Sequence, residues 1–192
     1  MMDAFEAEKV IAKHRGNAIV VTAETASHEW PQISSTDLDL PFHGSMGMAS
    51  SLGLGLALAA PGRKVIILDA DGSLLMNLNS LVTIANMAPS NLIHFVLENG
   101  IYRTTGGQPI PNAGKVSFTG LAKASGYPHA HEFDKLDDLE GSIETIMNQA
   151  GPTLVCLKIP PITESTPYPF PSSAELLTAY GRLRKTLGGS SN

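Results

Sequence analysis

Oxygen-bearing side chains follow two short apolar segments of the sequence. These side chains are Asp69, Asp71, Glu98 and Asn99. The first two follow residues 65–68 and the last two follow residues 92–97, and both segments predict buried parallel strands. Because ligands collect at the carboxyl ends of such strands, we expect all four side chains to face one crevice. Carboxylate and amide oxygens suit a Mg²⁺ ion that holds a phosphorylated ligand, so the pattern predicts a site of that kind.

The segment between these two strands predicts a helix over residues 73–87. Gly72 and Ser73 would begin this helix, and the free N–H groups at its amino end favour a phosphate beside the metal. A purely structural interpretation is also open, in which the acidic side chains only cap the helix.

Strands and helices alternate along the chain, which is typical of an α/β domain with a parallel sheet. We expect further strands over residues 18–22, 128–133 and 152–159, and further helices over residues 3–15, 49–59, 118–125, 136–150 and 173–187. Residues 23–30 predict a turn that carries hydroxyls, an imidazole and two carboxylates. Residues 31–41 have no clear period and predict an irregular surface segment.

The length of 192 residues indicates one principal domain, which we place at residues 1–160. Residues 161–187 predict a Pro-rich linker and a C-terminal helix, and residues 188–192 predict a flexible tail.

Composition argues against several classes of protein. The net charge of −5 disfavours nucleic-acid binding, and residues 46–60 are too short an apolar stretch to cross a membrane. The acidic start lacks a signal-peptide pattern, which predicts a cytoplasmic protein. The single cysteine, Cys156, and the imidazole of His94 lie in apolar runs and are expected in the core.

Asp-Gly-Ser at residues 71–73, followed by Asn-Gly at residues 99–100, resembles the diphosphate and Mg²⁺ motif of thiamine diphosphate enzymes. The resemblance implies that Mg²⁺ is held by Asp71, Asn99 and the carbonyl of Ile101, and that the diphosphate lies against Gly72 and Ser73. The sequence departs from the motif at two positions that are not metal ligands in the family, Ala70 and Glu98. The implied fold is a three-layer α/β sandwich, with a mostly parallel sheet of about six strands and helices on both faces.

A second motif, Gly-Ser-Met-Gly at residues 44–47, resembles the segment that grips the aminopyrimidine of thiamine diphosphate. The resemblance implies that the Gly44 carbonyl accepts from the exocyclic amine, that Ser45 belongs to the binding segment, and that Met46 forms an apolar wedge under the cofactor. Considered alone, Met46 would more simply lie on the buried face of a helix. In the resembled decarboxylases a hydroxyl from the turn at residues 23–30 reaches the diphosphate, which makes Ser27 a candidate and Thr25 a weaker one.

A third motif, Thr-Gly-Gly-Gln-Pro at residues 105–109, is similar to a segment of sulfopyruvate and phosphonopyruvate decarboxylases. The resemblance to these enzymes as a whole covers residues 18–159. Substrates of that branch carry a remote anion, which Arg103 or His43 could bind by charge-assisted hydrogen bonds. A structural role for Arg103 fits equally well. His28 and His43 are weak candidates for catalytic groups, and for His28 a solvated loop position is the alternative.

The resemblance covers only the diphosphate-binding half of such enzymes. It implies that the activating glutamate belongs to a companion subunit that carries the pyrimidine-binding domain, in a hetero-oligomer of α₂β₂ type or larger. We therefore expect the chain to be inactive alone, and to act with thiamine diphosphate, Mg²⁺ and its companion as a decarboxylase of a small anionic 2-oxo acid. The sequence does not identify the 2-oxo acid.

Three alternatives stay open from the sequence. The first is a thiamine diphosphate-dependent carboligase or lyase subunit of the acetolactate synthase type. The second is a phosphatase, because residues 69–73 also resemble the opening motif of haloacid-dehalogenase-type enzymes, in which Asp69 would be the nucleophile. The third is a cofactor-binding scaffold without catalysis.

Overall fold

The computed structural model of the chain describes residues 1–161 and 171–188. Its centre is a six-stranded sheet in which every neighbouring pair is parallel and the strand order is β2-β1-β3-β4-β8-β7. These strands are β1 (Ile19–Ala23), β2 (Asp39–Phe42), β3 (Val65–Ala70), β4 (Leu92–Glu98), β7 (His129–Phe133) and β8 (Thr153–Lys158). A separate two-stranded arm pairs β5 (Ile101–Tyr102) with β6 (Gln108–Pro109) in antiparallel fashion.

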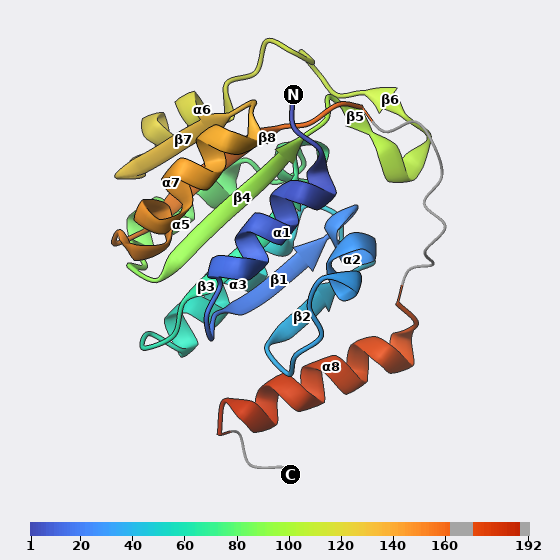
Figure 1. Cartoon of the computed structure of the whole chain (residues 1–192), viewed down its shortest axis with the longest axis vertical. Helices are drawn as coiled ribbons and strands as arrows, with labels where there is room; N and C mark the ends of the chain where they lie inside the picture. Colours follow the sequence, from blue (N-terminus) through green and yellow to red (C-terminus); the bar gives the residue numbers. More distant parts are fainter. Residues whose placement is uncertain (162–170, 189–192) are drawn as a thin grey trace.

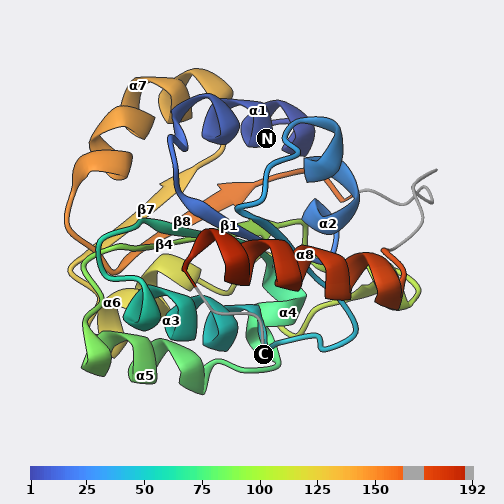
Figure 2. The same cartoon turned by 90° about the horizontal axis from the view of Figure 1, so that it is seen from below.

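Helices cover both faces of the sheet, as Figures 1 and 2 show. One layer contains α1 (Ala4–His14), α2 (Ala26–Glu29), the 3₁₀ turn η1 (Trp30–Gln32) and α7 (Leu136–Asn148). The other contains α3 (Ala49–Ala59), α4 (Asp71–Leu75), α5 (Asn79–Met87) and α6 (Phe118–Ser125), and α8 (Ser173–Thr186) packs beside β2. The expected three-layer α/β sandwich is therefore confirmed.

The central strands form because they are almost uninterrupted apolar runs, and every residue of β1 and β4 is buried. Such runs are stable only with helices on both sides, because burying apolar surface contributes about 25 cal/mol of favourable free energy for each Å². The strand order reverses between β1 and β3, because β1 continues outward to β2 while β3 continues to β4. The crevice at such a switch point is where open α/β sheets bind ligands.

Two expectations about local structure are wrong. Residues 31–41 include an edge strand, β2, which the sequence hides because it has four residues and contains Pro41. Proline is tolerated there because only one side of an edge strand is paired. The expected helix over residues 73–87 is two helices, separated at residues 76–78, where the Asn77 side chain donates to the Gly47 carbonyl.

Most other elements agree with the sequence pattern within a few residues. The expected turn at residues 23–30 contains the short helix α2, and the expected C-terminal helix is α8. Cys156 and His94 are fully buried, as expected. Most of the predicted linker, residues 162–170, and the tail residues 189–192 lie outside the described residues. Over the described part of the chain, no helix is both long enough and apolar enough to span a membrane.

Candidate active site

A small cleft lies at the carboxyl ends of β1, β3 and β4, beside the switch point. It is lined by Glu24, Thr25, Met46, Ala70, Gly72, Asn99, Ile101, Tyr102, Arg103 and Thr104. These residues come from four segments that are far apart in the sequence. The fold therefore brings the motifs at residues 44–47, 71–73 and 99–100 to one place.

Asp71 stands in the sequence between the lining residues Ala70 and Gly72 and is fully buried. One of its carboxylate oxygens accepts from the N–H of Gly72 and the other from the N–H of Gly100, at 2.7 Å each. The second bond joins the end of β3 to the turn after β4. Burial raises the pKa of Asp71 to about 6, although the two backbone donors act in the opposite direction.

Asn99 belongs to the same turn and is also buried. Its amide oxygen accepts from the N–H of Ile101 at 2.9 Å, which tightens the chain before the arm begins. Ala70 pairs with Leu97 in the sheet, so the next residues of both strands leave it at the same edge. Asp71 and Asn99 are thus brought together.

The turn at residues 44–47 is tied to the start of α4. The N–H of Gly47 donates to the hydroxyl of Ser73 at 3.1 Å, and Gly47 has a φ of +88°, which favours glycine. Gly72 must also be glycine, because a Cβ there would lie 2.6 Å from the ring of Tyr102. Gly44 and Ser45 are exposed, whereas Met46 is half-buried and faces the cleft.

The donor set suits a divalent cation. Within the described residues, the groups that shift the pKa of Asp71 are backbone N–H groups and the like-charged Glu98, not a cationic side chain. A buried carboxylate without a cation is unfavourable, so a bound ion would stabilise its charged form. The amide oxygen of Asn99 and the Ile101 carbonyl add hard oxygens of the kind Mg²⁺ prefers. The residues therefore fit the metal that the sequence pattern implies.

Of the four side chains expected at the crevice, Asn99 lines this cleft and Asp71 is buried between the lining residues Ala70 and Gly72. Asp69 and Glu98 contact other groups instead, so the expectation is wrong for these two. Asp69 is still inside β3, opposite Val96, and its carboxylate lies 3.3 Å from the imidazole of His94 on the neighbouring strand. Residues two apart on a strand share a face, so Asp69 and His94 lie on the same face of the sheet as Ile67 and Val96, the face that α3 and α5 cover.

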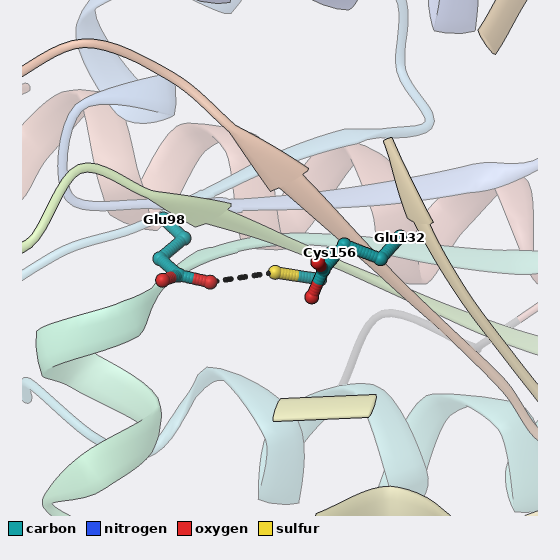
Figure 3. A group of neighbouring side chains, drawn as sticks. All are labelled: Glu98, Glu132 and Cys156. Carbon is teal, nitrogen blue, oxygen red and sulfur yellow. Dashed lines mark hydrogen bonds between the residues drawn. The ribbon is translucent and has the colours of Figure 1, made fainter. Parts of the chain in front are cut away.

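Glu98 instead joins a second cluster, with Glu132 and Cys156, in which the possible ligand atoms lie within 4.8 Å of one another (Figure 3). The Cys156 thiol donates to Glu98 at 3.0 Å, and Lys158 lies 2.6 Å from Glu98 and 3.5 Å from Glu132. Burial, and then the contact with Glu98, raises the pKa of Cys156, which favours the protonated thiol. Lys158 supplies the positive charge, and the cluster is an ion-pair network.

Two candidates from the turn after β1 also lie away from the cleft. The hydroxyl of Ser27 donates to the Thr22 carbonyl at 2.8 Å, and Ser27 is 2% exposed. Ser27 and His28 line a different cavity of about 600 Å³, which lies against η1, β2 and α8. Thr25, the weaker candidate, lines the cleft.

Arg103 lines the cleft and is held on the side that faces α2. Its guanidinium lies 3.3 Å from the hydroxyl of Thr25 and 3.8 Å from the carboxylate of Glu29. Burial raises the pKa of Glu29, and the charge of Arg103 opposes that rise. His43, the other candidate for the substrate anion, is half-buried at the end of β2.

The sequence pattern did not single out Glu24, Tyr102 or Thr104. Glu24 has a φ of +50°, a strained conformation for a residue with a side chain, and its carboxylate accepts from the Thr104 hydroxyl at 2.9 Å. Burial raises the pKa of Glu24 despite this hydrogen bond. The position of Glu24 directly after a buried strand was the feature of the sequence that could have identified it as a site residue.

Comparison with known families gives one match. Residues 21–157 match the model of the thiamine pyrophosphate enzyme, C-terminal TPP binding domain. A phosphonopyruvate decarboxylase of Streptomyces viridochromogenes is 41% identical over 155 residues, which are 80% of this chain and 38% of that protein. The sulfopyruvate decarboxylase subunit beta of Methanothermobacter thermautotrophicus is 34% identical over 168 residues, which are 87% of each chain.

More distant relatives agree with these matches. Acetolactate synthase isozyme 1 large subunit of Escherichia coli is 25% identical, over 73% of this chain and 28% of that protein. A solved structure from Mycobacterium smegmatis, described as that of a putative thiamin diphosphate-dependent enzyme, shares the fold, with a TM-score of 0.70 and 21% identity over 83% of this chain and 32% of that one. The chain thus spans little more than a third of the phosphonopyruvate decarboxylase and nearly all of the β subunit.

Proposed function

Because the chain belongs to the thiamine pyrophosphate enzymes, as a C-terminal TPP binding domain, we propose that it is the diphosphate-binding subunit of a 2-oxo acid decarboxylase. The substrate would be a small anionic 2-oxo acid of the sulfopyruvate or phosphonopyruvate type. The single observation that carries this proposal is the meeting of Asp71 with the turn at Asn99, through the 2.7 Å bond from Gly100. We also retain the expectation of a cytoplasmic protein.

In this proposal Asp71, Asn99 and the carbonyl of Ile101 hold Mg²⁺, and Gly72 and Ser73 lie against the diphosphate. Gly44, Ser45 and Met46 hold the aminopyrimidine end. The bound cofactor supplies an electron sink for the carbon–carbon bond that breaks. The chain's own part is to place that cofactor, to exclude water with Met46 and Tyr102, and to supply cations for the substrate.

Arg103 is the side chain best placed to meet a sulfonate or phosphonate, because it lines the cleft beside Thr25. Glu29 offsets part of its charge at 3.8 Å, so a substrate anion would compete with that contact. We assign no role in the cofactor site to Ser27 or His28, because the cavity that they line is a different one.

The relatives support the need for a companion. Those that this chain spans almost completely are named as β subunits, which implies another subunit. We propose a hetero-oligomer with a companion chain that carries the pyrimidine-binding domain and the activating glutamate, of α₂β₂ type or larger.

The similarity to acetolactate synthase supports a second candidate, a carboligase subunit that joins two 2-oxo acids. A phosphatase is disfavoured, because Asp69 is 1% exposed and its carboxylate faces His94.

The test is reconstitution with purified chains. Sulfopyruvate, phosphonopyruvate and pyruvate are each incubated with the chain, its companion, thiamine diphosphate and Mg²⁺, and CO₂ and acetolactate are measured. We expect CO₂ from an anionic 2-oxo acid only when both chains are present. Robust turnover by the chain alone would contradict the need for a companion, and acetolactate as the main product would favour the second candidate.

A further inference from the structure

Two carboxylates from the turn after β1 accompany the cationic side chains at the cleft. The carboxylate of Glu29 lies 3.8 Å from the guanidinium of Arg103, and the two side chains are only 13% and 12% exposed. Glu24, from the same turn, lines the cleft together with Arg103. The side chain that we propose to meet the substrate anion therefore already has a negative neighbour.

Glu24 stands in a similar relation to His43, the other candidate for the substrate anion. Burial raises the pKa of Glu24, and the charge of His43 opposes that rise, so the two side chains interact electrostatically. The hydroxyl of Thr104 fixes the Glu24 carboxylate with a hydrogen bond of 2.9 Å. Each candidate cation thus has one carboxylate of the same turn as a neighbour.

Both carboxylates are held in unfavourable positions. Glu24 has a φ of +50°, a conformation that glycine adopts without strain. One carboxylate oxygen of Glu29 is buried and has no hydrogen-bond partner among the described residues, which makes a charge there unfavourable. Strained or poorly satisfied groups of this kind are typical of functional sites, so we looked for a function of the two charges.

The charge of these two pairs bears on the substrate. Counted with neutral histidines, the two pairs contain one positive charge, on Arg103, and two negative charges, on Glu24 and Glu29. A substrate anion that approaches Arg103 adds further negative charge beside the two carboxylates. Because the energy of repulsion is proportional to each charge, a group with two negative charges is repelled about twice as strongly as a group with one.

We propose that Glu24 and Glu29 determine specificity, by making the cleft select a 2-oxo acid whose remote group carries a single negative charge. This inference rests on the proposed function and narrows its substrate class. Relatives named for either acid match this chain, so similarity does not decide between them. At pH 8 a sulfonate carries one negative charge and a phosphonate carries about two, so the enzyme should prefer sulfopyruvate to phosphonopyruvate.

The test compares kcat/KM for the two acids in the reconstituted enzyme at pH 8. Glu29→Gln and Glu24→Gln each remove one negative charge and keep the size of the side chain and one accepting oxygen. Asp37→Asn is the matched control. It removes a carboxylate that lies 3.5 Å from an arginine, Arg182, in an exposed pair whose residues do not line the cleft.

We expect the unaltered enzyme to prefer sulfopyruvate at least about tenfold, and each Gln variant to reduce that preference by a factor of about three to ten. The change should appear mainly as a lower KM for phosphonopyruvate, because the repulsion acts on the bound anion before and during the reaction. Asp37→Asn should leave the preference unchanged. A substitution that only disturbs the fold would lower kcat/KM for both acids alike, and the melting temperature of each free chain is measured beside it.

Three outcomes would overturn the proposal and leave the proposed function standing. They are equal use of the two acids or a preference for phosphonopyruvate, a preference that neither Gln variant reduces, and an equal reduction by Asp37→Asn.

Release of CO₂ from neither acid would instead contradict the proposed function, and binding then decides on the two glutamates. Sulfoacetate and phosphonoacetate carry the same two remote groups without a 2-oxo group, and calorimetry on the assembled protein measures their dissociation constants. Tighter binding of sulfoacetate that Glu29→Gln and Glu24→Gln reduce would uphold the selection by charge. Equal dissociation constants would overturn it.

Discussion

The hydroxyl of Thr104 donates a hydrogen bond of 2.9 Å to the carboxylate of Glu24, and thereby fastens the β5–β6 arm to the turn after β1. Glu24 holds a strained backbone conformation, with a φ of +50°. Strain of this kind persists where the surroundings fix a residue, often at functional sites. Because the arm also carries Ile101, this contact influences how firmly the proposed metal ligand is held over the cleft.

Removing that hydroxyl should loosen the arm. We expect Thr104→Val to weaken binding of thiamine diphosphate with Mg²⁺ about fivefold, because one hydrogen bond contributes about 1 kcal/mol net. Amide hydrogen exchange over residues 101–109 should become faster, and titration calorimetry on the assembled enzyme measures the affinity. Thr105→Val is the control, because among the described residues the hydroxyl of Thr105 makes one long hydrogen bond, to the Tyr102 carbonyl at 3.5 Å. Equal exchange in both variants would refute the role given to Thr104.

The charge of Asp71 should be essential for the metal. We expect Asp71→Asn to weaken Mg²⁺-dependent cofactor binding roughly a hundredfold, because a neutral oxygen replaces a charged ligand of a divalent ion. The substitution removes a buried charge, but it also replaces one of two accepting oxygens with an NH₂ group that faces a backbone N–H, so the melting temperature of the free chain is measured beside the affinity. Asp69→Asn is the matched control and should leave cofactor binding unchanged. Cofactor binding that survives Asp71→Asn but not Asp69→Asn would contradict the assignment.

Mg²⁺ should stabilise the chain more at high pH than at low pH. The pKa of Asp71 rises from an ordinary value of 3.8 to about 6 in the folded chain. The folded state therefore binds more protons than the unfolded one between these values, so the free energy of unfolding of the metal-free chain falls as pH rises through that window. Mg²⁺ requires the deprotonated form and should offset that loss.

The measurement is the shift in melting temperature on adding Mg²⁺ and thiamine diphosphate at pH 5 and pH 8. We expect a shift at pH 8, little shift at pH 5, and no pH dependence of the shift in Asp71→Asn. An equal shift at both pH values would rule out Asp71 as the titrating ligand.

Glu8 should destabilise the chain at neutral pH. It is fully buried on α1, and neither of its carboxylate oxygens has a hydrogen-bond partner among the described residues. Burial, and then the charge of Glu29, raises its pKa well above the ordinary value of 4.5. When the pKa of a carboxyl group is raised in the folded state, the free energy of unfolding of the protein falls as pH rises above the pKa that the group has in the unfolded state.

We therefore expect Glu8→Gln to increase the free energy of unfolding at pH 8 by roughly 1–3 kcal/mol, and to have little effect at pH 4, because the amide carries no charge. Urea denaturation at the two pH values measures this difference. Glu6→Gln on the exposed side of α1 is the control and should change stability by less than about 0.5 kcal/mol. A loss of stability at pH 8 would show that Glu8 has a favourable partner.

Much of the fold could be predicted because its central strands are apolar runs of a length that only strands explain. The strand β2 could not, since Asp39 and Pro41 break any period and its partner β1 lies outside the segment. The split between α4 and α5 was also hidden, because it depends on a contact of Asn77 with Gly47, thirty residues away.

The candidate site shows the same division. The motifs around Asp71, Asn99 and Met46 predicted residues that the fold brings near one another, and their roles toward a cofactor stay predictions. Ser27 was a reasonable candidate by its position in the sequence, yet its hydroxyl donates a hydrogen bond to the carbonyl of Thr22. The sequence does not show in which direction such a side chain points. The contact between Glu24 and Thr104 joins residues eighty positions apart, and the sequence pattern gave no sign of it.

The hydrogen bond from Gly47 to Ser73 bears on how the proposed enzyme would be divided between polypeptides. It joins the segment that we propose to hold the aminopyrimidine to the segment that we propose to hold the diphosphate. Binding of a ligand to one of these segments would also order the other, so the loss of conformational entropy on binding would occur once rather than twice. If the proposed enzyme is made of two chains, both segments stay within one of them, and the other chain can change in the 2-oxo acid that it recognises without disturbing them.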